Sequence, residues 1–202
     1  MLAKAGKTTG FALAVIVCLG IAFYASRYLF DGPGLSDFVL ANGNALPWLK
    51  IHIGGGILAL LIGPWQFVTR TRIVWYGLHR WAGRVYVIAC LGGGTAGLIL
   101  ALGTVQGPIA RSGFAGLALA WLATTATAWL KVRGGDYAAH RRWMIRSFAL
   151  TFAAVTLRIY LPIPPALGYD FDQGYRAIAW LCWVPNLLLA ELYVRWRPRI
   201  SS

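Results

Sequence analysis

The sequence predicts an all-α protein, a polytopic transmembrane bundle of about six helices. Two observations predict it. First, hydrophobic residues make up 58% of the 202 residues and charged residues only 12%, with a mean hydropathy of +0.62, which is too apolar for a soluble domain. Second, the apolar residues form six runs, and each is close to the about 20 residues that a helix needs to cross about 30 Å of hydrocarbon.

The six runs occupy most of the chain and define the predicted spans, which leave only short connections between them. No soluble domain fits in these connections, so we expect a single integral membrane domain over residues 1–202. The first run follows two lysines, but it is longer than the core of a signal peptide and is expected to stay as a helix. The predicted spans are residues 10–30, 46–68, 80–103, 113–131, 143–163 and 176–196.

The positive charges predict the orientation. The formal net charge is +13, but the nineteen Lys and Arg are spread over the connections, which argues against a nucleic-acid surface. With the N-terminus in the cytoplasm, fourteen of them fall on the inner side, as the positive-inside rule requires. Both termini are therefore expected in the cytoplasm, with the spans in the cytoplasmic membrane. The outer side holds only Arg27, Lys50, Arg111, Arg158 and Arg176.

Packing accounts for most of the other conspicuous residues. The three cysteines are single and widely spaced, without a disulfide or zinc pattern. Glycine runs at 54–56 in the second span and 92–94 in the third remove side-chain bulk and let neighbouring helix backbones approach closely. Tryptophans near the span ends fit the interfacial belt of membrane proteins.

The three histidines mark the candidate site. His79 and His140 are expected at similar depth on the inner side, where several arginines accompany them. We expect a polar cluster there that binds an anionic group, such as an anionic lipid or a quinone head group. The predicted binding residues are His79, Arg80, Arg84, His140, Arg142 and Arg146.

Three further polar residues fall within the predicted spans. His52 lies toward the opposite side and is expected to bond a neighbouring helix. Arg158 is close enough to Arg146 that at least one of them enters the bilayer, where a charge needs a partner. Glu191 is placed to pair with Arg84 or Arg146, whereas Asp170 and Asp172 are placed to meet Arg158.

Three function classes remain open. The favoured class is a non-enzymatic membrane protein, such as an accessory or assembly subunit of a membrane complex. The alternative is a redox protein with a single haem b, whose iron would be bound by His79 and His140. The third is a small transporter with Arg158 and Glu191 on its path. Hydrolase and nucleotide-binding motifs such as H-E-x-x-H, G-x-S-x-G and a P-loop are absent, so no catalytic residue is assigned.

Three motifs stand in order along the chain: H-x-G-G from His52, H-R-x-x-G-R-x-Y from His79, and H-R-x-W-M-x-R-S from His140. In these motifs the chain resembles a bacterial family of predicted membrane proteins of unknown function, over residues 48–160. The resemblance implies a polytopic membrane protein and brings no catalytic residues with it. A looser likeness to transmembrane di-haem cytochromes meets the difficulty that two bis-histidine haems need four imidazoles, and the chain has three histidines.

Overall fold

The structure, a computed structural model, describes residues 2–30, 42 and 45–196, and its regular elements over these residues are helices. The first half of the chain forms three long helices and a short connector. These elements are α1 (Leu2–Ser26), α3 (Ala45–Ile62), the 3₁₀ turn η1 (Pro64–Phe67), α4 (Thr69–Ile73) and α5 (Tyr76–Leu102).

The second half contains one more unbroken long helix and two that are interrupted. Tyr137–Ala166 and Phe171–Trp196 each cross the bundle as consecutive shorter helices. The elements are α6 (Pro108–Arg133), α7 (Tyr137–Thr151), α8 (Ala153–Tyr160), α9 (Ile163–Ala166), α10 (Phe171–Leu181) and α11 (Val184–Trp196).

Six helical segments in the described chain are long and apolar enough to cross a membrane, which confirms the predicted fold class. Their starts differ from the prediction, because α5, α6, α7 and α10 each begin four to six residues earlier. The reason for two of them is local: Asp136 and Asp170 cap the helices by accepting hydrogen bonds from Ala139 N and Gln173 N. The His79 and His140 side chains therefore lie in the first turns of helices.

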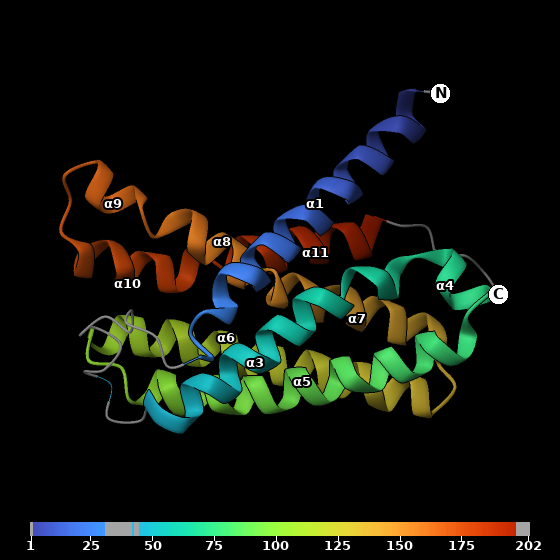
Figure 1. Cartoon of the computed structure of the whole chain (residues 1–202), viewed down its shortest axis with the longest axis horizontal. Coiled ribbons are helices and arrows are strands. Elements are labelled where there is room, and N and C mark those ends of the chain that lie inside the picture. Colours follow the sequence, from blue (N-terminus) through green and yellow to red (C-terminus); the bar gives the residue numbers. More distant parts are fainter. Residues whose placement is uncertain (1, 31–41, 43–44, 197–202) are drawn as a thin grey trace.

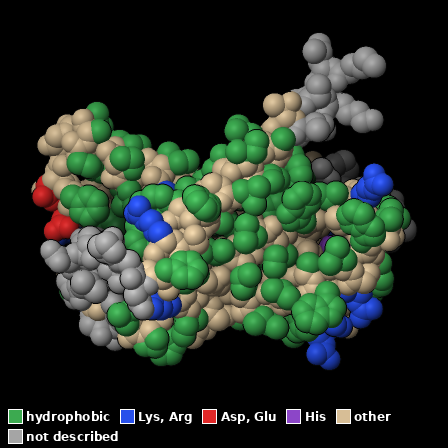
Figure 2. All heavy atoms as spheres, viewed as in Figure 1, with side chains coloured by type: hydrophobic (Ala, Val, Ile, Leu, Met, Phe, Trp, Pro, Cys, Tyr) green, Lys and Arg blue, Asp and Glu red, His purple; other side chains and the backbone are tan. Residues whose placement is uncertain are grey.

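The helices run lengthwise between two polar ends (Figure 1). We call the end with residues 63–75 and 134–136 the α4 end, and the end with residues 103–107 and 161–170 the α9 end. Helix α1 begins and α11 ends on the side of α4. In the face seen in Figure 2, Lys and Arg lie toward the two ends, with a mostly hydrophobic band between them. This distribution fits residence in a lipid bilayer.

Helices α3, α5, α6 and α7 form the centre of the bundle, α1 covers α3 and α8, and the α10–α11 segment covers α6 and α7. Glycines allow α3 and α5 to lie close together, as predicted. A Cβ at Gly55 would lie 2.5 Å from the Ala89 carbonyl oxygen and 2.9 Å from Gly93 Cα, too close for any side chain.

Two of the interruptions, that between α10 and α11 and that between α7 and α8, have different local causes. Pro185 lacks an N–H and its ring excludes the usual contact with the carbonyl of Leu181, so α10 ends just before it and α11 begins anew. Between α7 and α8 there is no proline. There the Thr151 hydroxyl donates to Ser147 O at 3.1 Å, an arrangement that bends helices.

A hydrogen-bonded group of side chains occupies the middle of the bundle, and we call it the core network. The Tyr86 hydroxyl lies 3.0 Å from both Ser147 Oγ and Thr151 Oγ1. Trp121 Nε1 donates to Thr151 Oγ1 at 3.0 Å, and Thr125 Oγ1 lies 2.7 Å from Ser147 Oγ. All five side chains are buried, so the network ties α5, α6 and α7 together where lipid offers no hydrophobic drive.

Candidate functional site

The connector between α3 and α5 folds back across the α4 end and brings in an arginine from outside the spans. Pro64 starts the 3₁₀ turn after Gly63. The Thr71 hydroxyl then donates to Val68 O at 2.7 Å and to Trp65 O at 2.9 Å. These bonds fix the short helix α4 and position Arg72 beside the start of α5.

His79 and Arg72 each carry a buried nitrogen without a hydrogen-bond partner. His79 is half-buried in the first turn of α5, and its Nδ1 is one of these nitrogens. The other is Arg72 Nε, although Arg72 Nη2 donates to Thr69 Oγ1 at 3.2 Å. An unsatisfied buried polar group costs about 1–3 kcal/mol, so the two atoms together favour a site that is completed by a ligand.

His140 lies in the first turn of α7 and is oriented by a backbone carbonyl. Its Nδ1 is 2.8 Å from Ala128 O. Because a carbonyl oxygen can only accept, Nδ1 carries the proton and Nε2 is the nitrogen left as an acceptor or ligand. The bond crosses the tight turn between α6 and α7, in which Gly135 has a φ of +77° that only glycine adopts readily.

Four basic side chains interact electrostatically here, and we call them the α4-end cluster: Arg72, His79 and His140, which are half-buried, and Arg141, which is exposed. His79 interacts electrostatically with Arg72 and His140. Burial and then the charge of Arg141 lower the pKa of Arg72. Within the described chain, no carboxylate forms an ion pair with any member of the cluster. The cluster therefore concentrates positive charge beside the N-termini of two helices, where anions bind well.

The structure brings together only two of the six predicted binding residues, His79 and His140. Arg80, Arg84 and Arg142 are exposed, and the Arg80 guanidinium lies 5.5 Å from the centre of the Tyr76 ring. Arg141, which directly follows His140, is exposed as well and belongs to the cluster through its electrostatic interaction with Arg72.

Arg146 belongs to an ion pair instead. Its Nη2 lies 2.7 Å from Glu191 Oε2, and the other oxygen of the same carboxylate accepts from Arg195 at 2.8 Å. The Arg146 guanidinium also lies 4.7 Å from the centre of the Trp143 ring. Of the two partners predicted for Glu191, Arg146 is the one it contacts, and the pair joins α7 to α11.

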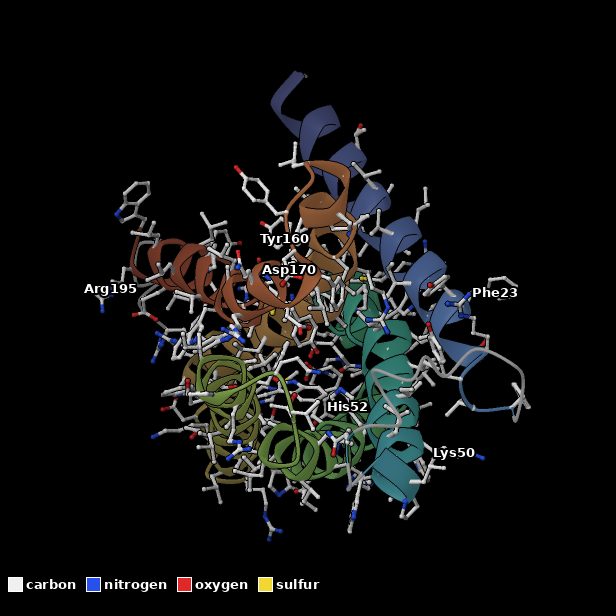
Figure 3. All side chains as sticks on the ribbon, turned by 90° about the vertical axis from the view of Figure 1, so that its left-hand side faces the viewer. Phe23, Lys50, His52, Tyr160, Asp170 and Arg195 are labelled. Carbon is white, nitrogen blue, oxygen red and sulfur yellow. The ribbon has the colours of Figure 1, made fainter. Side chains whose placement is uncertain are left out.

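At the other end, His52 points from α3 into the bundle, whereas Lys50 points outward (Figure 3). His52 Nδ1 donates to Gly93 O at 2.8 Å, as expected of a histidine that bonds a neighbouring helix. A Cβ at Gly97 would lie 2.8 Å from the same nitrogen. The glycines of α5 therefore also make room for this imidazole.

Arg158 does not meet the predicted carboxylates. Its Nη1 donates to Ala154 O at 2.8 Å, and the described chain contains no ion pair between it and Asp170 or Asp172. Asp170 is occupied as the cap of α10.

Sequence reasoning missed Arg72 and Arg141 as cluster members and missed the core network. One signal was available. On α5 the polar and small residues recur every three or four positions, at His79, Gly83, Tyr86, Cys90 and Gly93. Such spacing places them on one helix face, and this face carries His79, the core network and the contact with His52.

A comparison with protein families matches residues 49–194 to the family described as predicted membrane protein, DUF2306. The chain belongs to this family. The DUF2306 region contains all three histidines, the core network and the Arg146–Glu191 pair, and it confirms the resemblance found in the sequence. With the six spans it makes the chain a multi-pass membrane protein. No curated protein and no solved structure matches the chain.

Proposed function

We propose that this DUF2306 protein is a non-enzymatic membrane protein whose α4-end cluster holds an anionic head group, and that it serves as an accessory subunit of a membrane complex. The observation that carries the binding proposal is the pair of buried, unpartnered nitrogens, Arg72 Nε and His79 Nδ1. A phosphate oxygen would accept hydrogen bonds from Arg72 Nε and from His79 Nδ1 in the tautomer that is protonated there, and it would also provide the counter-charge. The phosphate of an anionic lipid suits a site at the membrane surface.

The α4 end is proposed to face the cytoplasm, because this end and the helix turns next to it hold ten of the nineteen Lys and Arg of the chain. These are Arg70, Arg72, Arg80, Arg84, Lys131, Arg133, Arg141, Arg142, Arg146 and Arg195. The natural cysteines are buried, so a single added cysteine can report its side of the membrane. We expect Tyr137→Cys to react with an impermeant maleimide only in inverted vesicles. Tyr169→Cys should react only in intact spheroplasts, and the reverse labelling would contradict this orientation.

Lipid binding tests the site. The purified protein is titrated with phosphatidylglycerol or phosphatidylcholine, and retained lipid is measured by native mass spectrometry. We expect Arg72→Gln to weaken phosphatidylglycerol binding about tenfold, the effect of losing one charge-assisted hydrogen bond of about 1.5 kcal/mol.

Arg70→Gln is the matched control, because Arg70 is exposed on the same short helix and loses the same charge. It should change the affinity less than about twofold. Equal losses in the two variants would mean that only the general charge of this end attracts lipid, and the proposed site would fail.

A second candidate is the single-haem redox protein, favoured by the orientation of His140. Histidines that bind metals commonly donate their second ring N–H to a carbonyl, as His140 Nδ1 does to Ala128 O. The test is to express the protein with haem supplied, purify it, and record absorption spectra of the oxidised and the dithionite-reduced forms. A Soret band that is lost in both His79→Ala and His140→Ala would establish the haem, and a featureless spectrum would exclude it.

A further inference from the structure

A second concentration of positive charge lies at the α9 end, far from the α4-end cluster. Its central residue is Arg158, in the last turn of α8, which is only partly exposed. One of its five N–H donors is used by Ala154 O. Within the described residues no carboxylate forms an ion pair with it. A guanidinium inside a membrane span without a counter-charge is costly.

Another guanidinium, that of Arg27, follows directly after α1. It lies 3.9 Å from the centre of the Tyr24 ring and 4.7 Å from that of Tyr28. Its Nη2 donates to both phenol oxygens, at 2.5 and 2.6 Å. These interactions hold an exposed arginine in one place instead of leaving it free in solvent.

The same two tyrosines are the electrostatic neighbours of Arg158. Arg27 and Arg158 therefore share the two phenols as electrostatic neighbours, and their like charges repel each other. Phenols are neutral near pH 7 and supply no negative charge. His52 also interacts electrostatically with Arg158, and its Nδ1 is already bonded to Gly93 O.

These groups lie where α1 packs against α3 and α8. Much of α1 is exposed and Arg158 is only partly buried, so the described residues do not close this place off from lipid. A lipid phosphate placed between the two arginines would accept hydrogen bonds from both and cancel their repulsion, because a guanidinium matches a phosphate in shape and charge.

We propose that Arg27 and Arg158 together bind the phosphate of an anionic phospholipid at the α9 end, in the leaflet opposite to the α4-end cluster. The tyrosines Tyr24 and Tyr28 hold Arg27 in position for it. This inference goes beyond the proposed function and uses none of its residues.

The test uses the full chain in mild detergent and measures lipid retained in native mass spectrometry, with phosphatidylglycerol against phosphatidylcholine. We expect Arg158→Gln to weaken phosphatidylglycerol binding about tenfold. Arg158→Lys keeps the charge but not the planar group, and its affinity for phosphatidylglycerol should lie between that of Arg158→Gln and that of the natural protein. Arg111→Gln, an exposed arginine at the same end, is the control and should change binding less than about twofold.

Arg27→Gln gives a second, independent variant, because Arg27 is exposed and lies outside the spans. Its loss of affinity should be at least about threefold even if Arg158→Gln fails to fold. Unchanged phosphatidylglycerol binding in Arg27→Gln, or no preference over phosphatidylcholine in the natural protein, would overturn the proposal. Because Arg72→Gln acts only at the other end, the two proposed sites are tested separately. A substitution at either site should remove one lipid from the number bound per protein and leave the lipid at the other site.

Discussion

Replacing Tyr86 with phenylalanine tests the core network, because the change removes one oxygen and leaves the ring. The hydroxyl lies 3.0 Å from Ser147 Oγ and 3.0 Å from Thr151 Oγ1. Its loss leaves neither partner without a hydrogen bond, because the Ser147 hydroxyl is still bonded to Thr125 and the Thr151 hydroxyl to Trp121. The cost is therefore that of two hydrogen bonds between helices, without an added desolvation penalty.

Hydrogen bonds of this kind average about 0.6 kcal/mol within membrane proteins, with a maximum of about 1.7. We expect Tyr86→Phe to lower the free energy of unfolding by about 1 to 2 kcal/mol. The assay is reversible unfolding in mixed micelles with increasing SDS, and Tyr137→Phe, whose ring is exposed at the start of α7, is the control. A loss below about 0.3 kcal/mol would refute the two bonds, and a loss above about 3 kcal/mol would mean that the ring itself has moved.

The same unfolding assay checks two further contacts. Gly55→Ala should lower the free energy of unfolding by about 1–3 kcal/mol, because the added Cβ meets the backbone of α5. Gly54→Ala, with nothing within 4 Å of its Cβ, should be neutral or stabilising. Equal effects of the two substitutions would contradict the close packing of α3 and α5. Glu191→Gln should lower the free energy of unfolding by about 1–2 kcal/mol, because the Arg146 side chain, which is only 16% exposed, loses its charged partner. Arg195→Gln, which removes a side chain that is 73% exposed, should lower it by less than about 0.5 kcal/mol. A larger effect of Arg195→Gln would reverse the assigned order of the two pairs.

The number of spans could be predicted because the solvent dictates it. In a bilayer each crossing must be a helix of about 20 apolar residues, and hydropathy alone finds such runs. The helix starts were harder, because Tyr76 and Tyr137 lie in polar and aromatic stretches that hydropathy assigns to connections. The capping aspartates Asp136 and Asp170 were the better signal for two of them.

The candidate site was predicted in part for a similar reason. His79 and His140 follow span starts, so their shared depth follows from topology alone. Whether an arginine faces the same side depends on helix rotation and on tertiary contacts, and Arg84 is exposed in the structure. Arg72 reaches the site only through the fold of the connector, which the bonds of Thr71 establish. Hydropathy contains no information about such a turn.

The central claim, that an anion binds at His79 and Arg72, can be measured at the nitrogen concerned. With three histidines in the chain, the ¹⁵N spectrum of a histidine-labelled sample is assignable by single substitutions. The account predicts that phosphatidylglycerol shifts the His79 Nδ1 resonance and that phosphatidylcholine does not, with Arg72→Gln suppressing the shift. A His79 resonance that stays unchanged when phosphatidylglycerol is added in excess would contradict it.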